Sequence, residues 1–173
     1  MRRILLTGMA GVGKSTVTGE LAARGYHAVD ADTEEYSEWA PIAGAGDAGP
    51  SPARPGMDWV WREDRVQALL AAEVAGTLFV SGCAENMRRF LPQFDRVILL
   101  SAPPEVMAVR LRERTTNAYG KDPAEAARAL ELAESVEPLL RRIATDEIDT
   151  RAPLDEVVAR VLRVALTPWP PPH

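Results

Sequence analysis

The sequence predicts an α/β fold in which helices cover both faces of a parallel sheet. Short apolar runs alternate with amphipathic stretches along the chain, as in folds whose strands are joined by crossover helices. The apolar runs are nearly continuous, which is typical of strands buried on both faces. The chain has 173 residues, of which 46% are hydrophobic and 26% charged. We therefore expect a single domain over residues 1–173.

Five strands are predicted from the apolar runs. The first four are rich in aliphatic side chains, and the fifth is weaker. They span residues 3–7, 26–29, 77–81, 96–100 and 145–149.

Helices are predicted where apolar residues recur at a spacing of three or four. Gly25 and Gly76 end two of them, and the pair Pro103-Pro104 opens another, because proline is favoured in a first turn. The predicted helices span residues 14–24, 33–39, 59–75, 85–91, 103–111, 123–144 and 154–166.

Two segments are rich in helix-breaking residues. Residues 41–56 contain four prolines and four glycines and can hold neither a helix nor a central strand. A loop of this length is an ordered specificity loop or a disordered insertion, and both interpretations remain open. The tail over residues 167–173 is proline-rich.

Composition excludes several classes of function. The net charge of −5 argues against nucleic acid or an anionic membrane as a general partner. The single cysteine, Cys83, excludes an intramolecular disulfide and gives no zinc-ligand spacing. No apolar run approaches the ~20 residues of a membrane span, and the run at residues 4–6 is too short for a signal peptide. We expect a cytoplasmic protein that binds neither nucleic acid nor membrane.

The strongest motif lies between the first strand and the first helix, where residues 8–15 match G-x-x-x-x-G-K-[ST]. Its glycines let successive backbone N–H groups turn inward to bind an anion, and the helix N-terminus adds partial positive charge. Lys14 would reach the β- and γ-phosphates of a nucleotide, and Ser15 would bind Mg²⁺. The predicted nucleotide-binding residues of this loop are Gly8, Met9, Ala10, Gly11, Val12, Gly13, Lys14, Ser15 and Thr16.

The sequence also narrows the class of P-loop protein. The D-x-x-G and N-K-x-D motifs of switch GTPases do not occur, and neither does the L-S-G-G-Q signature of transport ATPases. The third predicted strand, residues 77–81, ends without the acidic residue that motor ATPases carry there. Among the classes of P-loop protein, these absences leave the small-molecule kinases.

Two carboxylates, Asp30 and Asp32, follow the second strand, at the sheet edge where α/β folds bind ligands. One could hold Mg²⁺ through water, and the other could orient and deprotonate an acceptor hydroxyl. Alternatively, Asp32 only caps a helix, since Glu35 stands three residues later in the spacing of a capping box.

Four segments of the chain carry a resemblance to a known family: GMAGVGKST, GYHAVDADT, ILLSAPPEVMAVRLRERT and EIDT. Together they resemble the shikimate kinase and gluconate kinase branch of the P-loop kinases. It implies a P-loop NTPase fold of three α/β/α layers, with a five-stranded parallel sheet in the order 2-3-1-4-5 and a small lid near residues 114–123. It also implies that Asp32 contacts the acceptor hydroxyl and that Asp30 lies near the metal.

The resemblance further implies an ATP-dependent kinase that uses Mg²⁺ and phosphorylates a hydroxyl of a small molecule. Arg110 would stack on the nucleobase, Arg114 would approach the phosphates together with Lys121, and Arg151 would lie at the edge of the base site. For Arg110 and Arg114, a solvated basic face of the helix is the alternative. ATP or GTP, and a monomer or a homodimer, remain open. An antibiotic-modifying or nucleoside phosphotransferase is the nearest alternative function, and a nucleotide-binding regulatory protein is the second.

The acceptor is predicted to bind against the segment between the second and third strands, residues 33–62. Trp39, Trp59 and Trp61 cluster there beside Arg62, and aromatic faces with an arginine suit a ring-bearing or partly apolar acceptor. The alternative is that Trp59 and Trp61 cap the core at a helix start, while Arg62 pairs with neighbouring acids.

The rim of the acceptor pocket is predicted at Gly82 and Cys83, directly after the third strand. The chain reads SGC here, where shikimate kinases carry three glycines, and the arginine that binds the shikimate carboxylate has no clear counterpart. An acceptor other than shikimate is therefore predicted.

Overall fold

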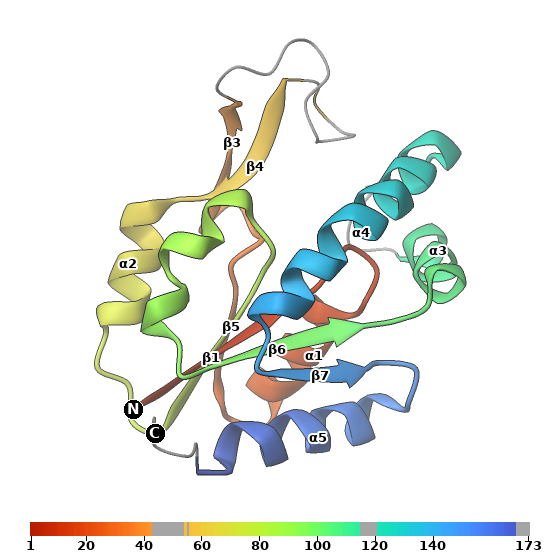
Figure 1. Cartoon of the computed structure of the whole chain (residues 1–173). Coiled ribbons are helices and arrows are strands. Elements are labelled where there is room, and N and C mark those ends of the chain that lie inside the picture. The colour runs from red at the N-terminus through yellow and green to blue at the C-terminus, as the bar shows by residue number, and fades with distance from the viewer. Residues whose placement is uncertain (43–53, 55, 115–120, 169–173) are drawn as a thin grey trace.

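Five parallel strands form the centre of the fold (Figure 1). The computed structural model describes residues 1–42, 54, 56–114 and 121–168. The sheet has the order β2-β5-β1-β6-β7, which is 2-3-1-4-5 when its own strands alone are counted, as predicted. The strands are β1 (Arg2–Thr7), β2 (His27–Asp30), β5 (Thr77–Ser81), β6 (Arg96–Ser101) and β7 (Asp146–Asp149).

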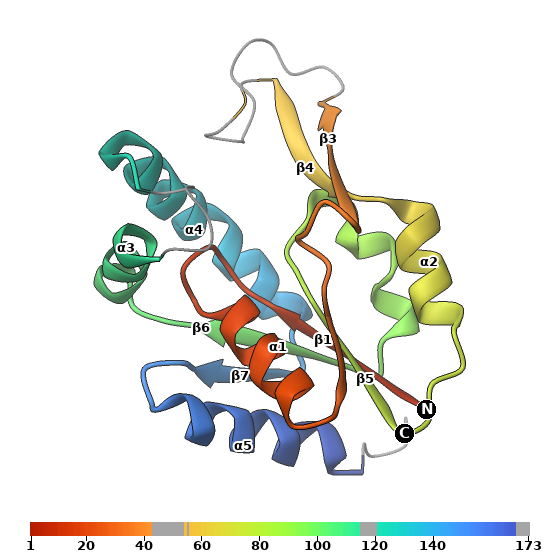
Figure 2. The ribbon, with the colours of Figure 1, turned by 180° about the vertical axis from the view of Figure 1, so that it is seen from behind.

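Helices cover both faces of this sheet and give the predicted three layers. Helices α1 and α5 lie together on one face (Figure 2), and α2, α4 and the two 3₁₀ segments lie on the other (Figure 1). Helix α3 packs beside α4. The helices are α1 (Lys14–Ala23), α2 (Glu63–Ala71), η1 (Glu85–Arg89), η2 (Leu91–Gln93), α3 (Pro104–Glu113), α4 (Pro123–Ile143) and α5 (Leu154–Leu166).

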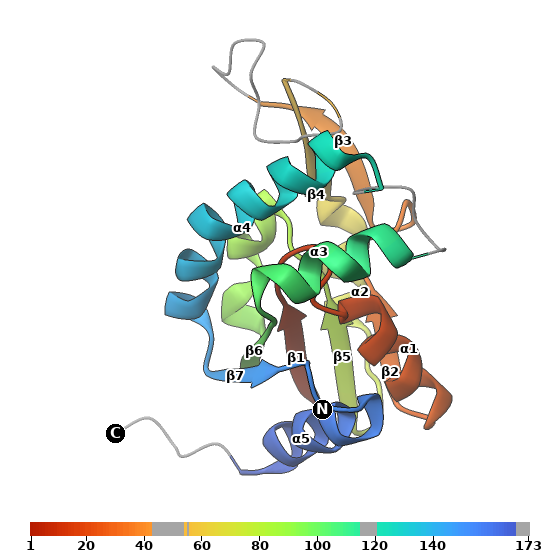
Figure 3. The same ribbon diagram turned by 90° about the vertical axis from the view of Figure 1, so that its right-hand side faces the viewer.

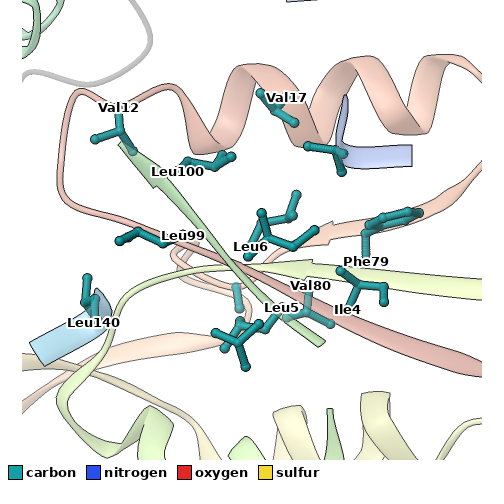
Figure 4. Close-up of a cluster of buried hydrophobic side chains, with 14 of the residues drawn as sticks. Ile4, Leu5, Leu6, Val12, Val17, Phe79, Val80, Leu99, Leu100 and Leu140 are labelled. Atoms are coloured by element: carbon teal, nitrogen blue, oxygen red, sulfur yellow. The ribbon is translucent and has the colours of Figure 1, made fainter. Parts of the chain in front are cut away.

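The core lies around the central strand β1. Ile4, Leu5 and Leu6 are fully buried, because helices cover both faces of the strand and β5 and β6 flank it (Figure 4). Burying one such side chain contributes about 1.5–3 kcal/mol. This packing explains why the strands read as continuous apolar runs, and it fixes the carboxyl end of β1, where the glycine-rich loop begins.

The first residue of that loop has room only for glycine. Gly8 has a φ of +152°, and a Cβ atom there would lie 2.4 Å from the carbonyl oxygen of Leu100 at the end of β6. The loop therefore packs directly on the neighbouring strand. It ends at Gly13, whose left-handed conformation precedes α1.

Between β2 and α2 the structure differs from the prediction. The helix predicted over residues 33–39 is wrong, because this segment is a turn followed by β3 (Ser37–Pro41). The helix predicted from residue 59 begins only at Glu63, after β4 (Met57–Trp61). Strands β3 and β4 form an antiparallel hairpin, since aromatic residues favour strands once a cross-strand partner is present. Figure 3 shows this hairpin beyond the carboxyl ends of β1 and β5, at the edge of the sheet where the glycine-rich loop follows β1.

Most other elements were predicted to within a few residues. The helix predicted over 85–91 is instead a pair of 3₁₀ segments, the second of which contains a proline in its first turn.

Most of the predicted loop, lid and tail lies outside the described residues, at positions 43–53, 55, 115–120 and 169–173. Over the part of the chain that is described, no helix combines the length and the apolar character needed to cross a membrane.

Candidate active site

Lys14 stands at the centre of the glycine-rich loop. Its Nζ donates hydrogen bonds to the carbonyl oxygens of Gly8 at 2.6 Å and Met9 at 3.2 Å. Only 11% of its side chain is exposed. The ammonium group and the N-terminus of α1 thus place positive charge at one point, which is the arrangement that binds phosphate.

The other predicted loop residues support this arrangement in different ways. Met9 and Val12 are buried against the core, whereas Ser15 and Thr16 are exposed in the first turn of α1. The carbonyl oxygen of Val12 accepts hydrogen bonds from other parts of the chain, as described below. The buried side chains of Met9 and Val12 therefore hold the loop on the core, whereas the start of α1 is exposed to solvent.

Asp30 and Ser15 form the predicted metal site. The Ser15 hydroxyl donates to Asp30 Oδ2 at 2.6 Å, and Asp30 Oδ1 accepts the backbone N–H of Asp32 at 3.0 Å. Among the described residues, no group of three or more acidic, histidine or cysteine side chains could hold a metal. One carboxylate and one hydroxyl suit Mg²⁺, which usually completes its shell with waters and substrate phosphates. These residues therefore fit the ion that the fold implies.

Asp32 lies close to the lysine. Its Oδ2 is 3.9 Å from Lys14 Nζ, and both carboxylate oxygens accept the backbone N–H of Cys83, at 3.1 and 3.2 Å. Burial, together with the charge of Asp30, raises the pKa of Asp32 from 3.8 to about 6, against the opposing effects of Lys14 and the Cys83 amide. A carboxylate with this pKa is suited to accept a proton near neutral pH. The capping alternative is wrong, because no helix follows Asp32.

Gly82 allows Asp32 to lie against Trp61. A Cβ atom at Gly82 would be 2.8 Å from Asp32 Oδ1 and 2.9 Å from both Nε1 and Cζ2 of Trp61. Trp61 is 1% exposed, and its indole also lowers the pKa of Asp32. The prediction placed Gly82 at the rim and counted Trp61 among the aromatic residues near the acceptor, but it did not place Trp61 beside Asp32. Only the position of β4, which the sequence pattern did not reveal, brings this tryptophan to the carboxylate.

Cys83 contributes through its backbone. Its N–H binds the Asp32 carboxylate, while burial raises the pKa of its thiol above the ordinary value. A neutral thiol is a poor nucleophile. The predicted rim residue therefore helps to hold Asp32, and its sulfur has no evident chemical part.

Trp59 and Arg62 belong to the β3–β4 hairpin. Trp59 packs edge-on against Trp39, with ring centroids 5.0 Å apart. The Arg62 guanidinium lies 3.6 Å from Glu38 and donates to the carbonyl oxygen of Ser37. Arg62 thus pairs with an acid, as the alternative interpretation held, but the acid is Glu38 on the facing strand and not one of the predicted partners Glu63 and Asp64. Contact of either residue with an acceptor stays a prediction.

Arg110 joins the glycine-rich loop to the end of β7. Its guanidinium donates to the carbonyl oxygens of Val12 and Thr150 and to the Thr150 hydroxyl, at 2.7 to 3.0 Å. The buried Thr150 hydroxyl in turn donates to Val12 at 2.6 Å. The alternative of a solvated face does not describe Arg110. Local spacing could not predict this role of Thr150, because its hydroxyl binds a residue 138 positions away in the chain.

The remaining predicted cations lie near the ends of elements. Arg114 ends α3, and Lys121 is exposed just before α4. Arg151 forms an exposed ion pair with Asp149 at 2.6 Å. Their contacts with a nucleotide stay predictions.

Comparison with known proteins identifies a family and a fold. A family model described as an AAA domain matches residues 4–131. A shikimate kinase from Acinetobacter baumannii, solved with shikimate, is 22% identical with a TM-score of 0.63, over 96% of this chain and 93% of that one. A shikimate kinase from Bacteroides thetaiotaomicron is 18% identical with a TM-score of 0.59, over 94% and 97% of the two chains. No curated protein matches. The predicted resemblance to the shikimate kinase fold is confirmed.

Proposed function

Since this chain belongs to the AAA domain family and has the P-loop fold of shikimate kinases, we propose that it is an ATP-dependent phosphotransferase. It transfers the γ-phosphoryl group to a hydroxyl of a small molecule. One observation carries this proposal: Asp32, a carboxylate that can act as a base, lies 3.9 Å from the phosphate-binding Lys14. A protein that only bound or hydrolysed a nucleotide would not need an acceptor-orienting carboxylate at this point.

In the proposed reaction the acceptor hydroxyl oxygen attacks the γ-phosphorus. The hydroxyl proton passes to the Asp32 carboxylate, and the bond between the γ-phosphorus and the β–γ bridging oxygen breaks to release ADP. The Cys83 amide orients Asp32 through two contacts. Lys14 neutralises charge that develops on the phosphoryl oxygens, which is the main contribution a protein makes to this chemistry.

Ser15 and Asp30 would hold Mg²⁺, directly or through water. The bound ion supplies further positive charge to the β- and γ-phosphates. Arg110 fixes the loop from the side of β7, where the nucleobase is expected, and Arg114 and Lys121 would approach the phosphates from the lid.

The side chains of the β3–β4 hairpin favour a ring-bearing acceptor. Arg62, the arginine predicted for this region, is engaged by Glu38 and Ser37. The pair Trp39 and Trp59 supplies aromatic surface there, with the Arg54 guanidinium 5.0 Å from the centre of the Trp39 ring. A hydroxylated, ring-bearing compound such as a nucleoside, a sugar or an antibiotic is therefore a better candidate than shikimate.

An acceptor screen tests this proposal. Purified protein with Mg²⁺ is incubated with ATP or GTP and with nucleosides, sugars, shikimate and hydroxylated antibiotics, and products are detected by ³¹P NMR and mass spectrometry. We expect stoichiometric phosphorylation of one class. Asp32→Asn should abolish most transfer while retaining ATP binding.

Two results would count against the proposal. Transfer at near the wild-type rate by Asp32→Asn would remove Asp32 as the base. Hydrolysis of nucleotide without phosphorylation of any acceptor, combined with nucleotide-dependent binding to a protein, would favour a regulatory role.

A further inference from the structure

Trp61 carries a buried donor that lies beside the Asp32 carboxylate without completing a well-formed hydrogen bond to it. Among the described residues, two buried side-chain polar atoms have no hydrogen-bond partner, Trp61 Nε1 and Ser81 Oγ. Leaving such a group unpaired costs about 1–3 kcal/mol, so native proteins rarely do so without a reason. Both atoms belong to residues that adjoin Gly82, one through the chain and one through space. Of the two, Trp61 Nε1 is the one that lies beside the candidate base.

The backbone of Trp61 is firmly fixed. Its N–H donates to Asn86 Oδ1 at 2.9 Å, and its carbonyl oxygen accepts from Asn86 Nδ2 at 2.9 Å. The indole also packs against Phe90, with ring centroids 5.8 Å apart. Because η1 holds the residue at both backbone groups, the direction of the indole is set by the fold.

The indole N–H and the Asp32 carboxylate lie side by side over Gly82. Both are within 3 Å of the point that a Cβ atom at position 82 would occupy. The carboxylate already accepts the Cys83 amide with both oxygens, and a carboxylate has capacity for further donors. A small movement of either side chain would pair them.

We propose that Trp61 is a positioning residue that acts through Asp32, its indole N–H serving as a second donor to the carboxylate that the Cys83 amide holds. The effect on catalysis rests on the proposed function, whereas the contact itself does not. With two fixed donors, the carboxylate presents its remaining lone pairs in one direction, toward the hydroxyl that it deprotonates.

The first experiment observes the contact without any acceptor. The indole N–H signals of ¹⁵N-labelled protein are assigned in wild type and in Asp32→Asn. We expect the Trp61 signal to move strongly in the variant, while the signals of Trp39 and Trp59 in the same spectrum stay in place. An unmoved Trp61 signal would overturn the proposal, and this result is independent of whether the protein is a kinase.

The second experiment measures the consequence for transfer. Trp61→Phe keeps an aromatic ring but removes the donor, and we expect kcat to fall about tenfold, the equivalent of one hydrogen bond to a charged group, with KM for ATP unchanged. In the Asp32→Asn background the same substitution should have little further effect. Equal losses in both backgrounds would show a purely structural role.

A stability control separates packing from positioning. Phe90→Leu weakens the contact with the Trp61 ring but retains the indole N–H, and kcat should stay within about twofold of wild type. If Phe90→Leu lowers kcat as much as Trp61→Phe does, packing rather than the donor is responsible and the proposal fails. If no acceptor is phosphorylated by wild type, the proposed function fails, and the NMR experiment still decides the contact.

Discussion

Replacing Gly82 by alanine should disrupt the candidate base while sparing the nucleotide site. The added methyl carbon would lie 2.8 Å from Asp32 Oδ1 and 2.9 Å from two atoms of Trp61, whereas ordinary contacts begin near 3.5 Å. Each neighbour must therefore retreat by roughly half an ångström. The backbone has little freedom to yield, because the Gly82 N–H donates to Leu6 in the central strand at 3.0 Å.

The expected magnitude follows from this overlap. Overpacking of a buried site costs about 1–3 kcal/mol, which in a chain of this size lowers Tm by about 2–10 °C. Displacement of the base by a fraction of an ångström to one ångström lowers transfer by up to about 10²-fold. ATP binding should be retained, because the hydrogen bonds that anchor the glycine-rich loop involve neither Asp32 nor Gly82.

Gly19→Ala is the matched control. Gly19 lies within α1, is exposed, and has nothing within 4 Å of its Cβ position. The same substitution should stabilise the protein there by about 0.5–1 kcal/mol. Thermal unfolding, calorimetric ATP binding and transfer rates would be measured on both variants. If Gly82→Ala matches Gly19→Ala in stability and transfer, the close packing of Asp32 and Trp61 has been misread.

Three further predictions concern the rest of the site. Lys14→Met should weaken ATP binding by at least tenfold in calorimetry, because the loop loses its fixed positive charge. Thr150→Val should also weaken ATP binding by severalfold, while Thr150→Ser restores it, since the hydroxyl donor to Val12 is what the loop requires. In metal-free buffer, protonation of Asp32 stabilises the folded protein because its folded pKa of about 6 exceeds the ordinary 3.8. Wild type should therefore lose up to about 3 kcal/mol of unfolding free energy between pH 4 and pH 7 relative to Asp32→Asn, by urea titration. A flat difference would contradict that pKa.

The fold was predictable because its signals are local and agree with each other. Residues 4–6 are continuously apolar, and a run this short, directly before a glycine-rich turn, is typical of a strand buried on both faces. The glycine-rich loop then specifies what stands at the end of this strand, since Gly8 meets the carbonyl oxygen of Leu100. Lys14, Ser15 and Asp30 were predicted for the same reason, because each belongs to a sequence motif of fixed spacing.

Residues 33–62 were misread because local spacing there is ambiguous. Over seven residues, an apolar pattern does not separate a helix from a strand, and the capping-box spacing of Asp32 and Glu35 added a false helix start. What decides the structure is non-local: Trp39 lies opposite Trp59 in the hairpin. The spacing of apolar residues within one segment does not reveal a strand partner that lies twenty residues away.

The error in that segment concealed the part of the site that the fold assembles from separate elements. Asp32 follows β2, Trp61 ends β4, and Gly82 follows β5, and they meet only once β4 is recognised as a strand whose last residue is held by Asn86 in η1. A tryptophan assigned to a helix start has no reason to face the end of β5. Motifs of fixed spacing therefore locate the phosphate side of this site, whereas the acceptor side depends on pairings that only the three-dimensional structure supplies. The same division explains why the chemistry of transfer is better defined than the acceptor: the atoms that would bind a nucleotide belong to one short motif, and those around the base come from three distant strands.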